Sequence, residues 1–218
     1  MEGLVNCMKK ANVSDAVIRR LPRYYRYLDV LHNKGTVRIS SNSLGSKMGI
    51  TASQIRQDLS CFGEFGQQGY GYNVEMLYTR ISSILGLDKG YKTIIIGSGN
   101  LGHALANYGG FANRGFTLTA MFDSDEEKVG LEIAGLKVKH CSELEEFIKR
   151  ENPDIAILAV PKTAVVSVAE ELVSYGIKAL WNFAYVDLLL PGDVTVENVH
   201  LSDSLMTLSY RMSENKGK

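Results

Sequence analysis

The stretch Thr93-Ile94-Ile95-Ile96-Gly97-Ser98-Gly99-Asn100-Leu101-Gly102 decides the fold of the larger part of this chain. Its first four residues form the apolar run of a buried strand, and a G-x-G-x-x-G pattern follows directly and opens a helical segment that runs to about Tyr108. In a dinucleotide-binding turn the first glycine allows a tight turn, the second lets the backbone approach a pyrophosphate, and the third permits close packing of the helix. We assign these roles to Gly97, Gly99 and Gly102, and all six residues from Gly97 to Gly102 are candidate cofactor contacts. The alternative is a glycine turn that merely packs a helix.

An acidic residue follows where the adenosine ribose of a bound dinucleotide would lie. Asp123 ends the next predicted strand, Thr117 to Phe122, and a carboxylate at this point accepts hydrogen bonds from the ribose hydroxyls. The next four residues, Ser124-Asp125-Glu126-Glu127, contain no arginine that would pair with a 2′-phosphate. The sequence therefore predicts a site for NAD(H) rather than NADP(H).

Strands and helices continue to alternate after Asp123. The predicted elements are a strand, a helix, a strand and a C-terminal amphipathic helix, at residues 154–160, 163–175, 178–183 and 203–211. Apolar strands that alternate with amphipathic helices indicate an α/β Rossmann domain, a doubly wound parallel sheet covered on both faces. A change of pattern near Leu87-Asp88-Lys89-Gly90 places the start of this domain at residue 87.

The preceding part, residues 1–86, has the pattern of a helix-turn-helix. Apolar spacing predicts helices at 22–32 and 43–48, and Pro22 suits either the first turn of a new helix or a kink. After a turn with Gly49, Thr51 and Gln54 give the capping-box pattern of a third helix. That helix would direct its polar side chains outward as candidate DNA contacts: Ser53, Gln54, Arg56 and Gln57. Such side chains read bases and phosphates, although an ordinary polar helix face is the alternative.

A glycine-rich segment after this helix predicts a β-hairpin. Glycines alternate with aromatic and amide residues from Gly63 to Tyr72, and Asn73 then caps a helix that runs from Val74 to Leu85. A hairpin after a helix-turn-helix is a wing, so we expect a winged-helix DNA-binding domain. Residues 1–86 carry 11 Lys and Arg against 6 Asp and Glu, whereas the whole chain has 24 of each, and a basic balance suits a nucleic-acid partner.

Several classes of protein are excluded by composition. The apolar runs are too short for a membrane span and the N-terminus does not resemble a signal peptide, so we expect a cytoplasmic protein. Three scattered cysteines form no C-x-x-C pair, so we expect no metal and free thiols, including Cys61. The candidate acid/base groups His103, Lys162 and His200 fall in no motif for hydride transfer, and we expect no catalytic residue and no enzyme.

Together these segments resemble Rex, the redox-sensing transcriptional repressors of bacteria. The resemblance rests on segments along nearly the whole chain: Ile18 to Arg26, Gln54-Ile55-Arg56, Asp58-Leu59, Phe62 to Gly66, Gly71 to Val74, Gly97 to Gly102, Val160-Pro161 and Asn182-Phe183-Ala184. It implies a homodimer on palindromic double-stranded operator DNA, released by NADH, with a domain-swapped C-terminal helix in residues 202–218. It also implies a Rossmann domain at 87–201, in which Tyr108 lies near the nicotinamide, Val160 and Pro161 contribute to the cofactor site, and His200-Leu201 approaches the partner's cofactor.

The chain departs from that family at three basic positions. Gln57 stands where such proteins commonly carry lysine, and Gln67-Gln68 stands where they carry Lys-Arg at the wing tip. We keep these residues and Tyr70 as candidate DNA contacts. Because each cation that contacts a phosphate releases counterions, we expect a shallower salt dependence than in a relative with the basic residues.

Two other functions remain open at this point. A small NAD-dependent oxidoreductase would use the same glycine turn, but it would show turnover and would not need a recognition helix. A regulatory subunit that resembles CoA-binding domains would explain the sheet but not the wing.

Overall fold

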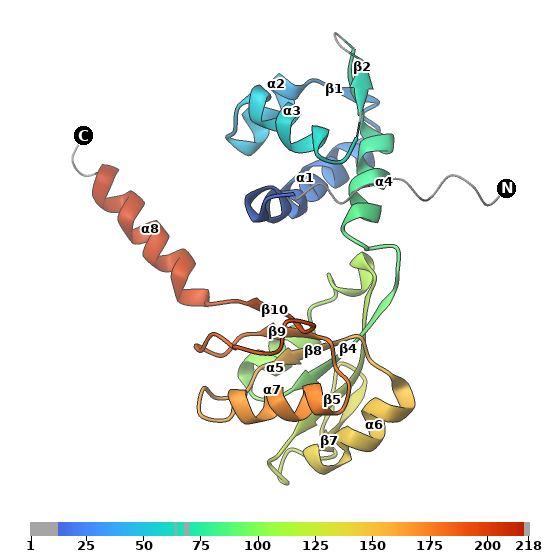
Figure 1. Cartoon of the computed structure of the whole chain (residues 1–218), viewed down its shortest axis with the longest axis vertical. Coiled ribbons are helices and arrows are strands. Elements are labelled where there is room, and N and C mark those ends of the chain that lie inside the picture. The colour runs from blue at the N-terminus through green and yellow to red at the C-terminus, as the bar shows by residue number, and fades with distance from the viewer. Residues whose placement is uncertain (1–12, 64, 68–69, 216–218) are drawn as a thin grey trace, which may run out of the picture. The chain divides into compact units, whose positions relative to one another are not determined.

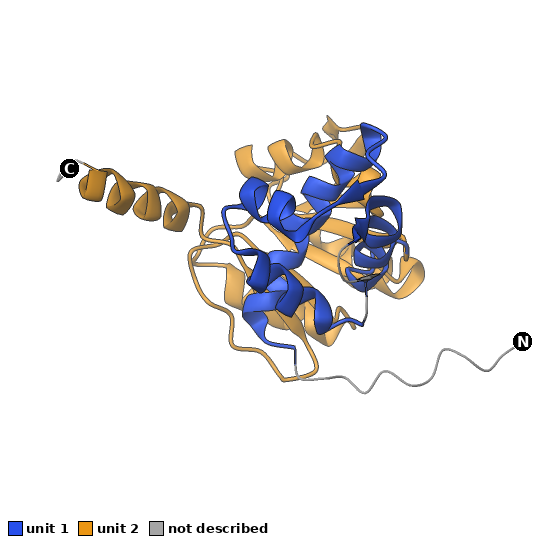
Figure 2. Cartoon of the chain, turned by 90° about the horizontal axis from the view of Figure 1, so that it is seen from above, with its two compact units in different colours: residues 1–88 blue, residues 89–218 orange. Residues whose placement is uncertain are grey.

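The computed structural model describes residues 13–63, 65–67 and 70–215. It divides into two compact units, Met1–Asp88 and Lys89–Lys218, which Figure 2 distinguishes by colour. The division falls two residues after the boundary at residue 86 that the sequence suggested.

The first unit combines helices with a small antiparallel sheet. Its elements are α1 (Asp15–Asn33), β1 (Arg38–Ile39), α2 (Ser41–Met48), α3 (Ala52–Ser60), β2 (Gly66–Gln67), β3 (Gly71–Asn73) and α4 (Val74–Ile84). The strands lie in the order β1-β3-β2, so the β2–β3 hairpin is the predicted wing. Figure 1 shows these elements in blue and green.

Helix α1 continues through Pro22, so a new helix does not start there. Proline removes one backbone hydrogen bond in a helix interior. Apolar residues before and after Pro22 are buried in one core with α2, α3 and α4; those of α1 include Leu21, Tyr24, Leu28 and Leu31.

The turn between α2 and α3 has the expected glycine and half of the expected capping box, because the Gln54 side chain bonds Asp58 and not the Thr51 backbone. Gly49 adopts φ +67°, a left-handed conformation that favours glycine, and Thr51 Oγ1 accepts a hydrogen bond from the backbone N–H of Gln54. Helix α2 begins two residues before the predicted start because Ser40 caps it, accepting from the N–H of Ser43 at 3.0 Å.

The second unit is a seven-stranded sheet with the strand order β10-β9-β8-β4-β5-β7-β6. Its strands are β4 (Tyr91–Ile96), β5 (Phe116–Asp123), β6 (Glu132–Ile133), β7 (Leu136–His140), β8 (Ile155–Leu158), β9 (Ala179–Asn182) and β10 (Thr195–Asn198). Its α-helices are α5 (Asn100–Ala106), α6 (Leu144–Glu151), α7 (Val165–Ser174) and α8 (Leu201–Asn215). All neighbouring strands are parallel except the edge pair β6–β7.

The two faces of this sheet are covered unequally. Helices α6 and α7 bury one face in a core that includes Phe122, Phe147 and Leu172. On the other face α5 packs over Ile95 and Met121 through Leu105 and Ala106. Helices thus lie on both faces, but part of the second face over β8, β9 and β10 stays open, because no helix lies between β9 and β10 and α5 is only seven residues long.

Candidate dinucleotide and nucleic-acid sites

Two glycines of the turn between β4 and α5 are required by the fold itself. Gly97 has φ +97°. A Cβ there would lie 2.5 Å from the carbonyl oxygen of Ala159, which directly follows the neighbouring strand β8. A Cβ on Gly102 would overlap the carbonyl oxygen of Gly97. The predicted roles of Gly97 in the tight turn and of Gly102 in helix packing therefore have direct steric causes.

Gly99 is different, because nothing in the chain lies within 4 Å of the position that its Cβ would take. Its φ of −67° is also open to any residue. The fold gives no reason for glycine at this position, whereas close approach of a ligand to the backbone does.

A cavity of about 690 Å³ opens beside this turn. Five of the predicted cofactor contacts line it: Gly97, Gly99, Asp123, Val160 and Pro161. Its size is in the range of small-molecule and cofactor sites. The remaining wall includes Ser124, Asp125, Lys128, Cys141 and Glu171, none of which the sequence analysis selected.

The other predicted cofactor contacts lie outside the lining of that cavity. Ser98 is buried, Asn100 is exposed on α5, and Leu101 and Gly102 lie in the body of the same helix. Tyr108 lines a smaller cavity of about 110 Å³, is 54% exposed, and contacts Phe111 edge-to-face.

Asp123 joins the turn to the end of β5. One of its carboxylate oxygens accepts hydrogen bonds from the Ser98 N–H at 2.8 Å and the Ser98 hydroxyl at 2.7 Å, and the other accepts from the Asp125 N–H at 3.0 Å. Burial raises the pKa of Asp123, but these hydrogen bonds and the nearby ammonium of Lys128 outweigh it, so the pKa lies below the usual value. Asp123 is therefore a carboxylate at neutral pH.

Lys128 is a cation that the sequence analysis missed. Its ammonium lies 3.5 Å from Asp123 and 3.2 Å from Asp125, so two carboxylates balance its charge. The turn after β5 brings it to the cavity although it lies five residues beyond Asp123. The absence of arginine at 124–127 therefore does not mean that the cavity lacks a positive charge.

Cys141 is a half-buried thiol in the same cavity wall. Burial, together with the negative charges of Asp123 and Glu171, raises its pKa to about 11. The thiol is therefore protonated at neutral pH and is a weak nucleophile. Cys61, in contrast, is exposed at the end of α3.

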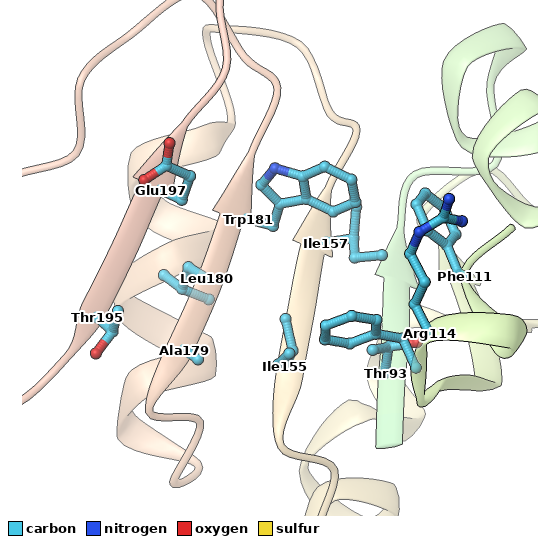
Figure 3. Close-up of a pocket in the computed structure, with 11 residues that line it drawn as sticks. Thr93, Phe111, Arg114, Ile155, Ile157, Ala179, Leu180, Trp181, Thr195 and Glu197 are labelled. Carbon is cyan, nitrogen blue, oxygen red and sulfur yellow. The ribbon is translucent and has the colours of Figure 1, made fainter. Parts of the chain in front are cut away.

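A second cavity, of about 410 Å³, lies on the open face of the sheet. Figure 3 shows its walls: Ile155 and Ile157 from β8, Ala179 and Trp181 from β9, and Thr195 and Glu197 from β10 lie beside Phe111 and Arg114. The surface that these residues expose to the cavity is almost entirely apolar. It is the part of the sheet that α5 leaves uncovered.

Only some of the polar side chains of α3 are without a partner inside the described part of the unit. Ser53 and Gln57 are exposed, and Arg56, also exposed, donates to the Ser41 hydroxyl at 3.1 Å. Gln54 is half-buried, and its amide nitrogen donates to Asp58 Oδ1 at 2.7 Å. The predicted set thus shares one helix face, but Gln54 is already engaged inside the unit.

Asp58 is completely buried and connects α3 to α1. Arg20 donates to both of its oxygens, at 2.7 and 2.8 Å, and the Tyr24 hydroxyl donates to one of them at 2.9 Å. Burial of the carboxyl raises its pKa, but the hydrogen bonds it accepts outweigh that effect and hold the pKa below its usual value. The sequence analysis gave this residue no role of its own, although it shares the buried helical face with Ile55 and Leu59.

At the wing, Arg38 of β1 lies beside Tyr70. Its guanidinium donates to the carbonyl of Tyr70 at 3.2 Å and is 5.9 Å from the centre of the tyrosine ring, which is 68% exposed. Gln67 ends β2, and Gln68 lies outside the described residues. The wing therefore presents a cation next to Tyr70 that the glycine pattern did not reveal.

Family models match both units. Residues 88–186 match the model described as "CoA binding domain", and residues 12–60 match "Putative DNA-binding protein N-terminus". The "Redox-sensing transcriptional repressor Rex" of Clostridium botulinum is 52% identical over 208 residues, which are 95% of this chain and 99% of the relative. The protein of the same name from Thermoanaerobacter pseudethanolicus is 57% identical over 94% of this chain and 92% of its own length.

The chain belongs to the Rex family. Solved structures of a Rex-family repressor, RSP, agree over the whole fold with a TM-score of 0.88. One is a complex with β-NAD⁺ and operator DNA, at 57% identity over 94% of both chains. Another is a complex with β-NADH, at 54% identity over 95% of this chain and 97% of the other.

Rex membership decides between the functions that the sequence left open. The relatives are named as transcriptional repressors, not as oxidoreductases, and the match to a CoA-binding model covers only the Rossmann unit. The acid/base candidates His103, Lys162 and His200 are absent from the described residues that line the larger cavity. His200 instead pairs with Asp187 at 3.1 Å before α8.

No helix in the described part of the chain has the length and apolar character needed to cross a membrane. The same residues contain no cluster of three or more His, Cys, Asp or Glu side chains suited to a metal ion.

Proposed function

We propose that this chain is a transcriptional repressor that binds operator DNA when NADH is scarce and leaves it when NADH binds. The observation that carries the proposal is full-length similarity to RSP, which was solved both with β-NAD⁺ and operator DNA and with β-NADH. The two candidate sites give the proposal a physical basis in this chain. A repressor acts on the chromosome, so we place it in the cytoplasm.

We assign the dinucleotide to the cavity of about 690 Å³. Gly99 leaves room for a pyrophosphate against the backbone, and Asp123 is an ionised acceptor for the ribose hydroxyls. Val160 and Pro161 also line this cavity, and Tyr108, which lines a smaller cavity, is a candidate neighbour of the nicotinamide. Ser98 acts indirectly, by holding Asp123.

The same cavity supports a preference for NADH over NADPH. The ammonium of Lys128 is the cation nearest to Asp123, but Asp123 and Asp125 both pair with it. A 2′-phosphate would have to displace those pairs and would meet two carboxylates. We expect NADPH to bind at least tenfold more weakly than NADH by calorimetry, and equal affinities would contradict this assignment.

We assign DNA binding to α3 and the wing. Ser53, Arg56 and Gln57 are exposed on α3, and Gln67 and Tyr70 belong to the hairpin that would lie along the phosphate backbone. Gln68, outside the described residues, stays a candidate from the sequence. Arg38 joins this set as a cation beside Tyr70. Repressors of this type read two half-sites about one helical turn, or a multiple of it, apart.

Two surfaces support a homodimer. Helix α8 buries none of its residues within the chain, and its exposed apolar residues Leu201, Leu205, Leu208 and Met212 recur at helical spacing along one side. The apolar cavity around Trp181 is the second surface. Apolar areas of this kind mark interaction sites, and we propose that a second copy covers both, with α8 exchanged between the copies.

The dimer has a direct test. Leu205→Glu with Leu208→Glu should convert the protein to a monomer in sedimentation velocity and abolish binding to a palindrome. Thr207→Glu adds one negative charge on another side of α8 and should leave the dimer intact. A dimer that survives the double substitution would contradict the role of this stripe.

Coupling between the two sites requires a difference in affinity. NADH shifts the protein away from the DNA-binding state only if it binds the other state more tightly, and linkage makes the effect reciprocal. Saturating operator DNA should therefore weaken NADH binding by the same factor by which NADH weakens operator binding. Calorimetric titration of NADH with and without operator tests this, and an unchanged NADH affinity would refute the coupling.

A further inference from the structure

The carboxylate of Asp58 has all its acceptor positions occupied by three side chains. Its Oδ1 accepts from Gln54 Nε2 at 2.7 Å and from one nitrogen of Arg20 at 2.8 Å. Its Oδ2 accepts from the other nitrogen of Arg20 and from the Tyr24 hydroxyl, at 2.7 and 2.9 Å. A carboxylate offers about four such positions, so this buried group is fully satisfied from inside the unit.

The contact fixes which way round the Gln54 amide lies. A carboxylate can only accept hydrogen bonds, so the amide group that faces Asp58 must be the NH₂ and not the oxygen. Turning the amide over would place two acceptor oxygens against each other in a buried site, with the loss of a charge-assisted hydrogen bond. Chemistry therefore assigns this amide, which distance alone would leave ambiguous.

The contact with Asp58 leaves the carbonyl oxygen of Gln54 and one of its two amide hydrogens for a ligand. Gln54 is the third residue of α3, within the turn that meets base edges when the second helix of a helix-turn-helix enters the major groove. No donor to its Oε1 occurs among the residues that the structure describes. A free glutamine side chain can turn its amide either way round against a base, but here Asp58 holds one amide hydrogen and so fixes the side on which the oxygen lies.

We propose that Asp58 fixes the Gln54 amide with its carbonyl oxygen as the acceptor offered to the groove, so that this oxygen selects a base with an amino group there. The bases of this kind are adenine, through N6, and cytosine, through N4, whereas guanine and thymine present carbonyl oxygens there. Gln54 is then the specificity-determining residue, and Asp58 is a positioning residue. The inference rests on the proposed function, because it requires that α3 lies in the major groove of an operator.

The test uses base analogues in an operator selected from random DNA by the full-length protein. At each adenine of a half-site, purine removes only the amino group, and 7-deazaadenine removes only the N7 acceptor. At each cytosine, 2-pyrimidinone removes only the amino group. At the position that Gln54 reads, removal of the amine should weaken binding of the wild-type protein about 5- to 150-fold, the range of a good base contact. At an adenine, 7-deazaadenine should weaken binding less than removal of the amine does.

Variants identify that position. Gln54→Met should make binding insensitive to removal of the amine there, whereas Gln57→Met, at a neighbouring glutamine without a bond to Asp58, should retain the sensitivity. Tyr24→Phe removes another donor to Asp58 and should also retain it. In Asp58→Asn the neighbour of Gln54 can donate as well as accept, so it no longer holds the Gln54 amide one way round. The sensitivity to removal of the amine should then fall at least fivefold, while NADH affinity is unchanged.

Each failure has a separate meaning. If Gln54→Met leaves the sensitivity unchanged at every position, or if 7-deazaadenine weakens binding as much as purine does, the carbonyl oxygen of Gln54 is not the group that selects the base and the inference is wrong. Because Gln54→Met alters one half-buried side chain, this holds even if Asp58→Asn does not fold. If selection yields no palindrome that NADH releases, the proposed function itself fails.

Discussion

Ser98 and Asp123 join the glycine turn to the next strand through two hydrogen bonds to a single carboxylate oxygen, at 2.8 and 2.7 Å. Asp123→Asn would replace one of the two carboxylate oxygens, which accept hydrogen bonds, by an NH₂ group, which donates them. Because hydrogen bonds to charged groups contribute about 1.5–3 kcal/mol, we expect NADH affinity to fall roughly 10- to 150-fold in calorimetric titration. Asp125→Asn is the matched control, since Asp125 lines the same cavity without a bond to Ser98, and it should change affinity less than threefold. Equal losses would contradict the special role of Asp123.

The two glycines of the turn should separate stability from binding. Gly102→Ala would place a methyl group against the carbonyl of Gly97, and we expect it to destabilise the protein by about 1–3 kcal/mol, as overpacking does. Gly99→Ala meets nothing within 4 Å, so its unfolding temperature should match the wild type while NADH affinity falls at least tenfold. Thermal unfolding and NADH titration of both variants check this. A destabilised Gly99→Ala, or a Gly99→Ala that binds NADH normally, would show that the turn works differently.

Acid should weaken the DNA-binding unit through Asp58. Its pKa is lower in the folded than in the unfolded protein, where it is about 3.9. The ionised carboxylate therefore contributes stability above that unfolded value, and the contribution is lost as the pH falls through the folded pKa. Asp58→Asn should be less stable than the wild type at pH 7, and the difference in urea midpoint should shrink between pH 4 and pH 3. A difference that is constant with pH would contradict this.

Salt should reveal the missing cations of the DNA-binding face. Gln57 is exposed on α3 without a charge, and each added phosphate contact steepens the slope of log affinity against log salt by about 0.9. Gln57→Lys should therefore increase the slope by roughly that amount. Ser213→Lys on α8 adds the same charge outside the DNA-binding unit and should leave the slope unchanged. If both variants changed the slope equally, the effect would reflect net charge alone.

The sequence was most informative where the backbone itself restricts the residue. Gly97 and Gly102 follow a buried strand and face carbonyl oxygens, so the fold requires glycine and the spacing records that requirement. The same holds for Gly49, whose left-handed φ marks the turn of the helix-turn-helix. Both domains could be predicted for this reason.

Contacts between distant segments were not predictable in the same way. Asp58 meets Arg20 and Tyr24, which lie 38 and 34 residues earlier, and no local pattern links such positions. Helical period did place Asp58 beside Ile55 and Leu59 on the buried face, and that was the available signal. Gln54 was predicted on the polar face, but its engagement by Asp58 followed only from the fold.

Short elements were missed for a different reason. Strand β6 has two residues and α6 eight, and five of those eight are charged, so neither gives a long apolar period. The turn between β5 and β6 that brings Lys128 to the cavity has no regular pattern. Residues whose positions depend on such connections could not be assigned from the sequence.

The central claim is that a reduced dinucleotide and operator DNA compete for the same protein through different conformations. The most direct measurement is operator binding by fluorescence anisotropy with increasing NADH, and separately with increasing NAD⁺, at constant salt. We predict that NADH releases the DNA while NAD⁺ alone leaves it bound, and that added NAD⁺ raises the NADH concentration needed for release. Equal retention of the operator with either nucleotide would contradict the account.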